Sequence, residues 1–173
     1  MASLNATQVI SLLGLEPLGI EGGYYRRIYE SRDTFDPSVL GGQRYQPCRR
    51  PLSSVIYYLM VPESFSALHW LSGDEVWNFL LGDPVEQLVL FPDGKGEIRV
   101  MGSPLDGSWS MVSVVQAGCW QGTRLKSSPG SCGFALCSTV MSPAYDAADF
   151  KLGDGSLVDK YPRFAQEIQR FLA

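Results

Sequence analysis

The sequence predicts an all-β fold, with minor helices at the two ends, built as a single barrel or sandwich. Short runs of β-forming residues recur at about ten-residue spacing. Gly, Pro and Asp separate these runs, and helical periodicity occurs only near the termini. The chain of 173 residues fits one domain, spanning residues 1–173. A chain this long buries enough apolar surface to fold without disulfides or a structural metal.

The expected strands occupy the middle of the chain, each bounded by turn residues. They cover residues 54–60, 65–71, 75–81, 85–91, 96–101, 109–116, 119–126 and 132–140. Residues 31–51 are rich in Gly, Pro, Asp and Arg and are predicted to form a long loop. The segment after Pro143 also lacks a strand pattern.

Each end of the chain carries one helical pattern. The first helix is expected over about residues 5–14, where Asn5 or Thr7 can cap its start and Gly14 ends it. The second is expected over about residues 161–172, where apolar residues recur near helical spacing.

The charge of the chain is mildly acidic, with a formal net value of −4. A nucleic-acid binder needs a concentrated basic face, so we expect no nucleic-acid partner. The one local exception is residues 44–50, which contain three arginines. We interpret this segment as a solvated loop, because a phosphate site needs more cations than these.

The cysteines do not form a metal-finger or disulfide pattern. The four of them, Cys48, Cys119, Cys132 and Cys137, contain no pair spaced as CxxC. The first residues lack the features of a signal peptide, and no apolar run reaches about 18 residues, the length that spans a membrane. We therefore expect a cytoplasmic protein with reduced thiols and no membrane partner.

The only histidine of the chain, His69, lies in the segment that holds the strongest candidates for chemistry. If residues 72–74 form a hairpin loop, His69, Leu71, Glu75 and Trp77 share one face of the ladder. His69 and Glu75 then become diagonal neighbours, about 7–8 Å apart at the backbone. An imidazole and a carboxylate so placed can hold a ligand, bind a metal or transfer a proton. The alternative is a surface hairpin with incidental polar residues.

Two motifs place this segment in a wider context. Glu75 followed after six residues by Gly82 resembles the end of the first cupin motif. Residues 116–121, Gln-Ala-Gly-Cys-Trp-Gln, resemble the second motif, whose usual form is Pro-x-Gly-x-x-His. Here Gln116 replaces the proline and Gln121 replaces the histidine.

Further motifs resemble one uncharacterised cupin family that is labelled only as a domain of unknown function. They are Glu-Gly-Gly-Tyr-Tyr-Arg at 21–26, Ser-Val-Ile-Tyr-Tyr-Leu at 54–59, Leu-His at 68–69, Asp-Glu-Val-Trp at 74–77, Gly-Asp-Pro at 82–84, Ala-Gly-Cys-Trp-Gln at 117–121 and the segment 139–150. The resemblance implies a double-stranded β-helix, or jelly-roll, barrel that is paired as a homodimer. It also implies a pocket at the barrel mouth and a relation to the sugar-nucleotide epimerases of the cupin superfamily, without an established activity.

Departures from the family pattern bear on metal binding. The family usually has a histidine after Asp-Glu-x-Trp, where this chain has Asn78. The most this site can offer a metal is His69, Glu75 and Gln121, and glutamine is a weak ligand for zinc, copper or iron. We therefore expect no metal and no cofactor.

The leading hypothesis is a small-molecule-binding cupin, with an epimerase-like activity on a sugar or sugar nucleotide. His69, oriented by Glu75, is the candidate base, and Tyr24, Tyr25 or Tyr57 is the candidate acid. The expected pocket residues are Glu21, Tyr24, Tyr25, Trp77, Asn78, Trp120, Gln121 and Arg124. The aromatic residues fit core packing equally well, and Arg124 fits a surface position. A non-catalytic binding module is the alternative function, and a metal-dependent enzyme is the least favoured.

Overall fold

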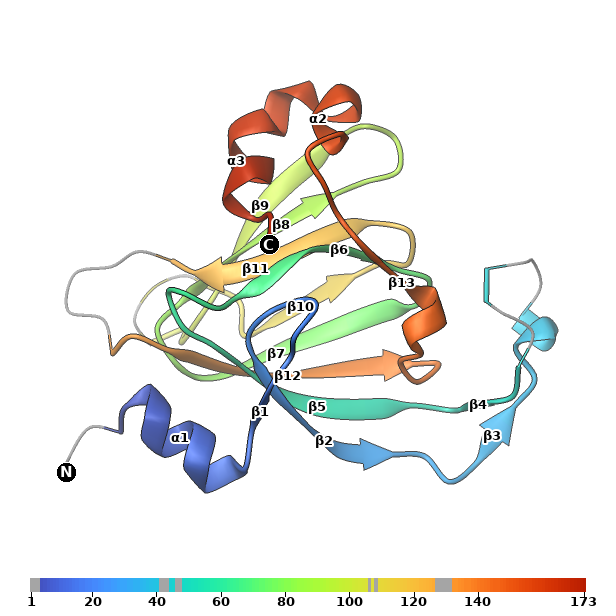
Figure 1. Ribbon diagram of the computed structural model, residues 1–173, viewed down its shortest axis with the longest axis horizontal. Coiled ribbons are helices and arrows are strands. Elements are labelled where there is room, and N and C mark those ends of the chain that lie inside the picture. Colours follow the sequence, from blue (N-terminus) through green and yellow to red (C-terminus); the bar gives the residue numbers. More distant parts are fainter. Residues whose placement is uncertain (1–3, 41–43, 46–47, 106, 108, 127–131) are drawn as a thin grey trace.

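Two antiparallel sheets face each other and enclose the interior of the molecule (Figure 1). The computed structural model describes residues 4–40, 44–45, 48–105, 107, 109–126 and 132–173. Within these residues one sheet has the strand order β1-β2-β5-β12-β7-β10 and the other β13-β6-β11-β8-β9. The short strands β3 and β4 pair separately at one end. This arrangement is the jelly-roll barrel that the motifs implied.

The strands are short, as the turn spacing predicted. The first sheet contains β1 (Glu16–Pro17), β2 (Tyr24–Glu30), β5 (Ser54–Met60), β7 (Asp74–Gly82), β10 (Val112–Val115) and β12 (Ala135–Ser142). The second contains β6 (Ser66–Leu71), β8 (Val85–Leu90), β9 (Gly96–Met101), β11 (Trp120–Leu125) and β13 (Phe150–Leu152). The remaining pair is β3 (Thr34–Phe35) and β4 (Arg50–Pro51).

The predicted N-terminal helix is present as α1 (Ala6–Leu13). Asn5 and Gln8 form a reciprocal capping box at its start, which satisfies backbone N–H groups that have no helical partner. Gly14 ends the helix in the left-handed conformation, with φ of 60°. The sequence signals at both ends are therefore confirmed.

The C-terminal prediction of one helix over 161–172 is wrong in its continuity. The segment forms a 3₁₀ turn η3 (Pro162–Phe164) and α3 (Ala165–Arg170), and a separate short helix, α2 (Leu157–Lys160), precedes it. Pro162 has no backbone N–H and cannot continue a helix that began before it, so the chain restarts there. Two further 3₁₀ turns, η1 (Pro37–Leu40) and η2 (Ala147–Asp149), lie in segments predicted as loop. No helix in the described part of the chain is long and apolar enough to cross a membrane.

The predicted hairpin between residues 65–71 and 75–81 is also wrong. β6 pairs with β11 and β13, whereas β7 pairs with β12 and β10. Ser72 and Gly73 therefore carry the chain from one sheet to the other instead of folding it back within a sheet. His69 and Glu75 consequently approach each other across the barrel and not along a ladder.

Alternation along the strands divides the side chains between the barrel interior and two outer layers. The interior cluster contains Tyr58, Trp77, Phe79, Val85 and Val89, among others. Helix α1 covers one outer face, where Val9 packs with Leu59 and Leu136. The C-terminal helices cover the other sheet, where Ile168 and Phe171 pack with Leu68, Leu88 and Leu90 (Figure 1).

Candidate functional site

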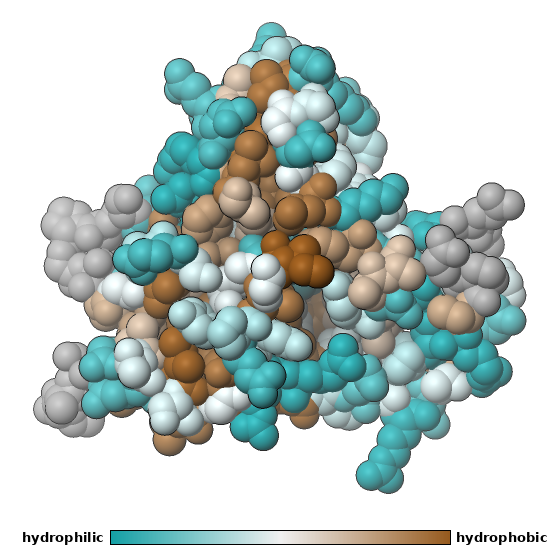
Figure 2. Space-filling view, in the orientation of Figure 1, coloured by the Kyte–Doolittle hydropathy of each residue, from teal (hydrophilic) through white to brown (hydrophobic). Residues whose placement is uncertain are grey.

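A cavity of about 140 Å³ opens between the two sheets. Sixteen side chains line it: Leu18, Ile20, Glu21, Tyr25, Arg27, Ser54, Ile56, Tyr58, His69, Leu71, Glu75, Trp77, Thr139, Met141, Tyr145 and Phe150. Most of them are apolar or aromatic. On the face of the molecule in Figure 2, apolar surface gathers near the centre and hydrophilic side chains dominate the lower edge. A cavity of about this volume holds a single small ring.

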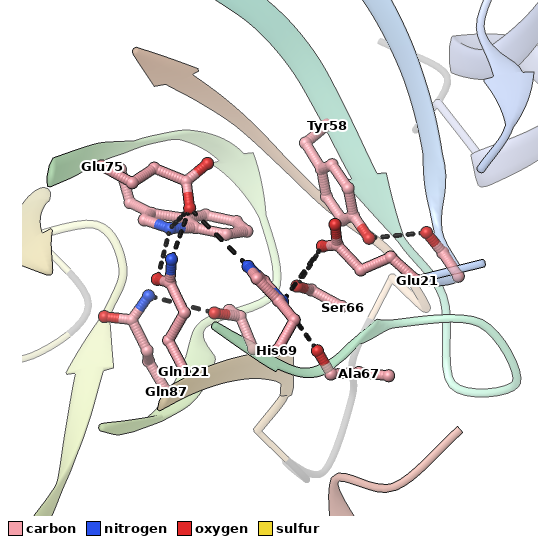
Figure 3. Close-up of polar contacts among 11 residues, drawn as sticks. Glu21, Tyr58, Ser66, Ala67, His69, Glu75, Gln87 and Gln121 are labelled. Carbon is pink, nitrogen blue, oxygen red and sulfur yellow. Dashed lines mark hydrogen bonds and ion pairs between the residues drawn. The ribbon is translucent and has the colours of Figure 1, made fainter. Parts of the chain in front are cut away.

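His69 lies on β6 and points into the interior, where its side chain is buried (Figure 3). Its Nδ1 lies 2.8 Å from the Ala67 carbonyl oxygen, which can only accept, so Nδ1 carries a hydrogen and donates it. Its Nε2 faces Glu75, with 4.0 Å between Nε2 and Oε2. The ring of Phe150 stacks on the imidazole at 5.4 Å between centroids.

Glu75 is fixed by two neighbours from the same end of the barrel. The amide of Gln121 donates from Nε2 to Glu75 Oε2 at 2.6 Å. The indole N–H of Trp77 lies 3.1 Å from both Glu75 Oε2 and Gln121 Oε1. These contacts hold one carboxylate oxygen in place, while Oε1 has no hydrogen-bond partner among the described residues (Figure 3).

Glu21 reaches the site from the loop between β1 and β2. Its Oε1 accepts a hydrogen bond from the Ser66 hydroxyl and lies 3.7 Å from His69 Nδ1. Gly22 follows with φ of 95°, and a Cβ there would lie 2.4 Å from the Phe65 carbonyl oxygen. Only glycine allows this approach, so the Glu-Gly-Gly motif brings a carboxylate to the imidazole.

The electrostatics of these groups are coupled. Burial lowers the pKa of His69, but Glu21, Glu75 and the Ala67 carbonyl more than offset this and raise it to about 9. Burial raises the pKa of Glu21 above its usual 4.5, although His69 opposes that rise. Burial also raises the pKa of Tyr58 well above 10. At neutral pH the imidazole is therefore a cation and the phenol is neutral.

The donor set does not fit a tightly held metal. In the described part of the chain no three His, Cys, Asp or Glu side chains gather in a metal-binding arrangement. The carbonyl oxygen of Gln121 already accepts from the Trp77 indole N–H, so it is not free to bind a cation. The residues instead form a hydrogen-bonded and charge-paired cluster.

Half of the predicted site residues line the cavity. Glu21, Tyr25, His69, Glu75 and Trp77 all do so. Gln121 lies behind them and contacts both Glu75 and Trp77.

The other four predicted residues do not line the cavity, because strand alternation turns them outward. Tyr24 packs with the cluster beneath α1, as does Tyr57, the candidate acid of β5. Trp120 packs beneath the C-terminal helices. Asn78 alternates with the inward Trp77, and Arg124 donates from Nη1 to the Arg170 carbonyl oxygen at 2.7 Å.

Several cavity residues were missed by the sequence reasoning. Tyr58 alternates with Tyr57, so correct assignment of the inward face of β5 would have found it. Its hydroxyl donates to the Gly22 carbonyl oxygen at 2.6 Å. Tyr145 and Phe150 lie in the motif segment 139–150, but that segment lacks strand periodicity and so did not indicate which of its side chains point inward.

Solved structures with the same architecture include two of full length. A hypothetical protein from Leishmania major has 27% sequence identity and a TM-score of 0.85, with 98% of this chain and 99% of that chain covered. A protein from Shewanella oneidensis has 30% identity and a TM-score of 0.83, with 99% of each chain covered. An oxalate decarboxylase from Bacillus subtilis shares the fold at 14% identity and a TM-score of 0.51, over 90% of this chain and 34% of that chain. No curated protein matches the chain.

The sequence also matches a family profile over residues 7–153, which is most of its length. The matched region contains the Glu-Gly-Gly motif at 21–23, the two cupin motifs at 75–82 and 116–121, and every cavity residue. The chain therefore belongs to the family described as Cupin superfamily (DUF985).

Proposed function

We propose that the cavity binds a small, uncharged polar ring such as a sugar, and that His69 and Glu75 transfer protons to and from it. The observation that carries this proposal is the imidazole of His69, buried between Glu21 and Glu75 beside the cavity. A buried charged cluster costs stability unless it is well paired, so its presence favours a role in chemistry or recognition.

The size and charge of the cavity support a neutral ligand. The volume of about 140 Å³ suits one ring and not a whole nucleotide. Two carboxylates face one imidazolium, so the cluster has a net charge of −1 when all three groups are ionised, and the lining Arg27 is already paired with Glu30. A free anion is therefore repelled from its inner end, whereas hydroxyl and carbonyl groups can hydrogen-bond there. The rings of Tyr58, Trp77 and Phe150 supply flat apolar walls.

The same geometry supports proton transfer next to a carbonyl group. Glu75 Oε1 accepts a proton from the carbon beside the carbonyl, and His69 gives its Nε2 proton to the carbonyl oxygen. The product is a neutral enol, a neutral imidazole and a protonated carboxyl. Return of the two protons restores all three groups, and the configuration is inverted when the enol has first turned its other face to Glu75. The pKa of about 9 makes His69 the acid in this pair at neutral pH.

The test measures binding and exchange separately. A thermal-shift panel of monosaccharides, keto sugars and small carboxylic acids should show stabilisation by neutral sugars and none by the acids. Exchange of deuterium from solvent into a bound ligand should occur in the wild type and cease in His69→Gln and in Glu75→Gln. Glu97→Gln, on the exposed β9, is the matched control. Exchange that persists in both site variants would contradict the proposed chemistry.

A non-catalytic binding module is the second candidate. It is favoured by the hydrogen bonds that already occupy the site: Tyr58 donates to a backbone carbonyl, and Glu75 Oε2 accepts from two side chains. Binding of a sugar without any exchange of deuterium would support this function over the first.

We further propose a homodimer that forms through the outer face of the larger sheet. Val55, Val76, Val114 and Val140 lie in one line there, since Val140 pairs with Val55 and Val76, and Val76 pairs with Val114. Val114 is 48% exposed. A continuous apolar stripe on one face suits a self-complementary contact around a twofold axis. Light scattering should give a dimer mass for the wild type and a monomer mass for Val114→Lys.

A further inference from the structure

Arg50 is buried, although its segment was predicted to be a solvated loop. Its side chain is 1% exposed, and the guanidinium faces Asp149, which is also buried. Nη1 donates to Asp149 Oδ2, and Nη2 donates to Oδ1 at 3.3 Å. This two-pronged geometry is the strongest form of an arginine–carboxylate contact. The interpretation of residues 44–50 as solvated is therefore wrong for Arg50.

Asp149 stands directly before a cavity residue. Its carbonyl oxygen accepts from the Ser72 N–H at 3.3 Å, which begins the short ladder between β13 and β6. In that ladder Phe150 pairs with Leu71, and Leu152 pairs with His69. The position of Asp149 thus determines where the Phe150 ring meets the imidazole of His69.

The guanidinium also lies 4.0 Å from Asp146 Oδ2 and 5.4 Å from the centroid of the Tyr45 ring, whereas the remaining contacts between these segments use the backbone of residues next to Arg50. The Ala144 N–H donates to the Pro51 carbonyl oxygen at 3.1 Å, and the Ser142 hydroxyl donates to the Leu52 carbonyl oxygen at 2.8 Å. These contacts do not need the guanidinium. Replacement of the Arg50 side chain therefore acts mainly on Asp149 and on the residue that follows it.

We propose that Arg50 is a positioning residue, which through its ion pair with Asp149 holds Phe150 against His69 and closes one wall of the cavity. Without the guanidinium, the Asp149 carboxylate is left buried and unpaired. An uncompensated buried charge is strongly unfavourable, so this carboxylate moves toward water and takes Phe150 with it. Water then reaches the imidazole and screens it from Glu21 and Glu75. The inference rests on the proposed role of His69, but the imidazole itself can be observed without any ligand.

The test is nuclear magnetic resonance of the imidazole protons, because His69 is the only histidine in the chain. At a pH low enough to protonate the imidazole in both proteins, the His69 Cε1–H signal of Arg50→Met should lie downfield of the wild-type signal, because the ring current of Phe150 is lost. The pKa from its titration should fall from about 9 toward 6.5. Arg50→Lys keeps the positive charge but not the two-pronged hydrogen bonding, so it should change the signal and the pKa by less. Phe150→Leu should reproduce the downfield shift directly.

The neighbouring arginine supplies the control. Arg49 is exposed and donates to Thr34, so Arg49→Met should leave the His69 signal in place. If Arg50→Met does not fold, Asp149→Asn keeps the shape of the side chain and weakens the pair, and the same downfield shift is expected. A folded Arg50→Met or Asp149→Asn whose His69 signal and titration match the wild type would overturn the proposal. That result would leave the proposed function standing, since it concerns exchange into a ligand.

Discussion

Two groups of polar side chains lie inside the barrel, and they differ in charge. Gln87, Ser113 and Thr123 are neutral: Ser113 Oγ donates to Gln87 Oε1 at 2.7 Å, and Gln87 Nε2 donates to Thr123 Oγ1 at 3.1 Å. Glu21, His69 and Glu75 are ionisable, and His69 lies 3.7 and 4.0 Å from the two carboxylates, beyond good hydrogen-bond distance.

The difference separates a structural network from the cluster that we propose to be functional. The three neutral side chains hydrogen-bond one another, Ser113 also accepts from Arg99, and all three lie away from the cavity. In such a network the hydrogen bonds within the protein replace those that the polar groups lose to water on folding. The three ionisable groups all line the cavity. Under the proposed function, a bound ligand supplies the hydrogen bonds that they lack. The comparison predicts that substitutions in the neutral network cost stability, whereas conservative ones in the charged cluster cost function.

The largest loss of stability is expected for Gln87→Ala. This change removes a fully buried side chain, takes away the donor to the Thr123 hydroxyl and leaves the Ser113 hydroxyl, which still accepts from Arg99, without its acceptor. We expect the free energy of unfolding to fall by about 3 kcal/mol or more, measured by urea denaturation. Gln116→Ala, on the exposed side of the second motif, should change it by less than about 0.5 kcal/mol. Equal losses of stability in the two variants would contradict a structural role for the neutral network.

The second effect is a loss of stability at alkaline pH. His69 has a folded-state pKa of about 9 against 6.5 in the unfolded chain, so its contribution is fully present below pH 6.5 and is lost as the pH rises through 9. The difference corresponds to about 3 kcal/mol. The raised pKa of Glu21 acts in the same direction at lower pH. Chemical denaturation at several pH values should show this slope in the wild type and a flatter one in His69→Gln. Identical slopes would mean that His69 is not the group responsible.

A smaller effect is expected for Tyr58→Phe. The lost hydroxyl leaves the Gly22 carbonyl oxygen without its donor, so stability should fall by about 1 kcal/mol in thermal or chemical unfolding. Glu21 should also become less well placed, because the loop that carries it loses one anchor. A weaker affinity for the sugar found by thermal shift would accompany the change. Unchanged affinity would restrict Tyr58 to a packing role.

The smallest effect on stability, within about 1 kcal/mol, is expected for Glu75→Gln. The new side chain keeps an oxygen for Gln121 and Trp77 and removes one buried charge. The pKa of His69 should nevertheless fall, since one of the two carboxylates that raise it is gone. Titration of the single histidine by nuclear magnetic resonance measures this fall. A large loss of stability would mean that Glu75, like Gln87, serves mainly to stabilise the fold.

Period-two patterns and turn residues predicted a barrel or sandwich and most of its strands, and the family motifs implied the jelly-roll barrel. The same patterns predicted that His69, Glu75 and Trp77 share one face of a hairpin, whereas these side chains meet at one cavity from two facing sheets. They could not predict whether residues 72–73 form a hairpin or a crossover, because alternation along a strand does not identify its neighbour in the sheet. They also gave no sign of β13, whose three residues acquire their conformation from the ladder with β6 and the ion pair of Asp149.

The crossover at residues 72–73 has a consequence for how the acidity of this site is set. His69 and Glu75 belong to opposite walls, so the gap between imidazole and carboxylate equals what the interior packing leaves between the sheets. Tyr58 and Trp77 meet edge to face within that packing, at 5.5 Å between ring centroids. A change of one methylene in the core alters the spacing of close-packed walls. The proton affinity of His69 therefore depends on the distance between the two sheets, and residues that never touch a ligand can change that distance.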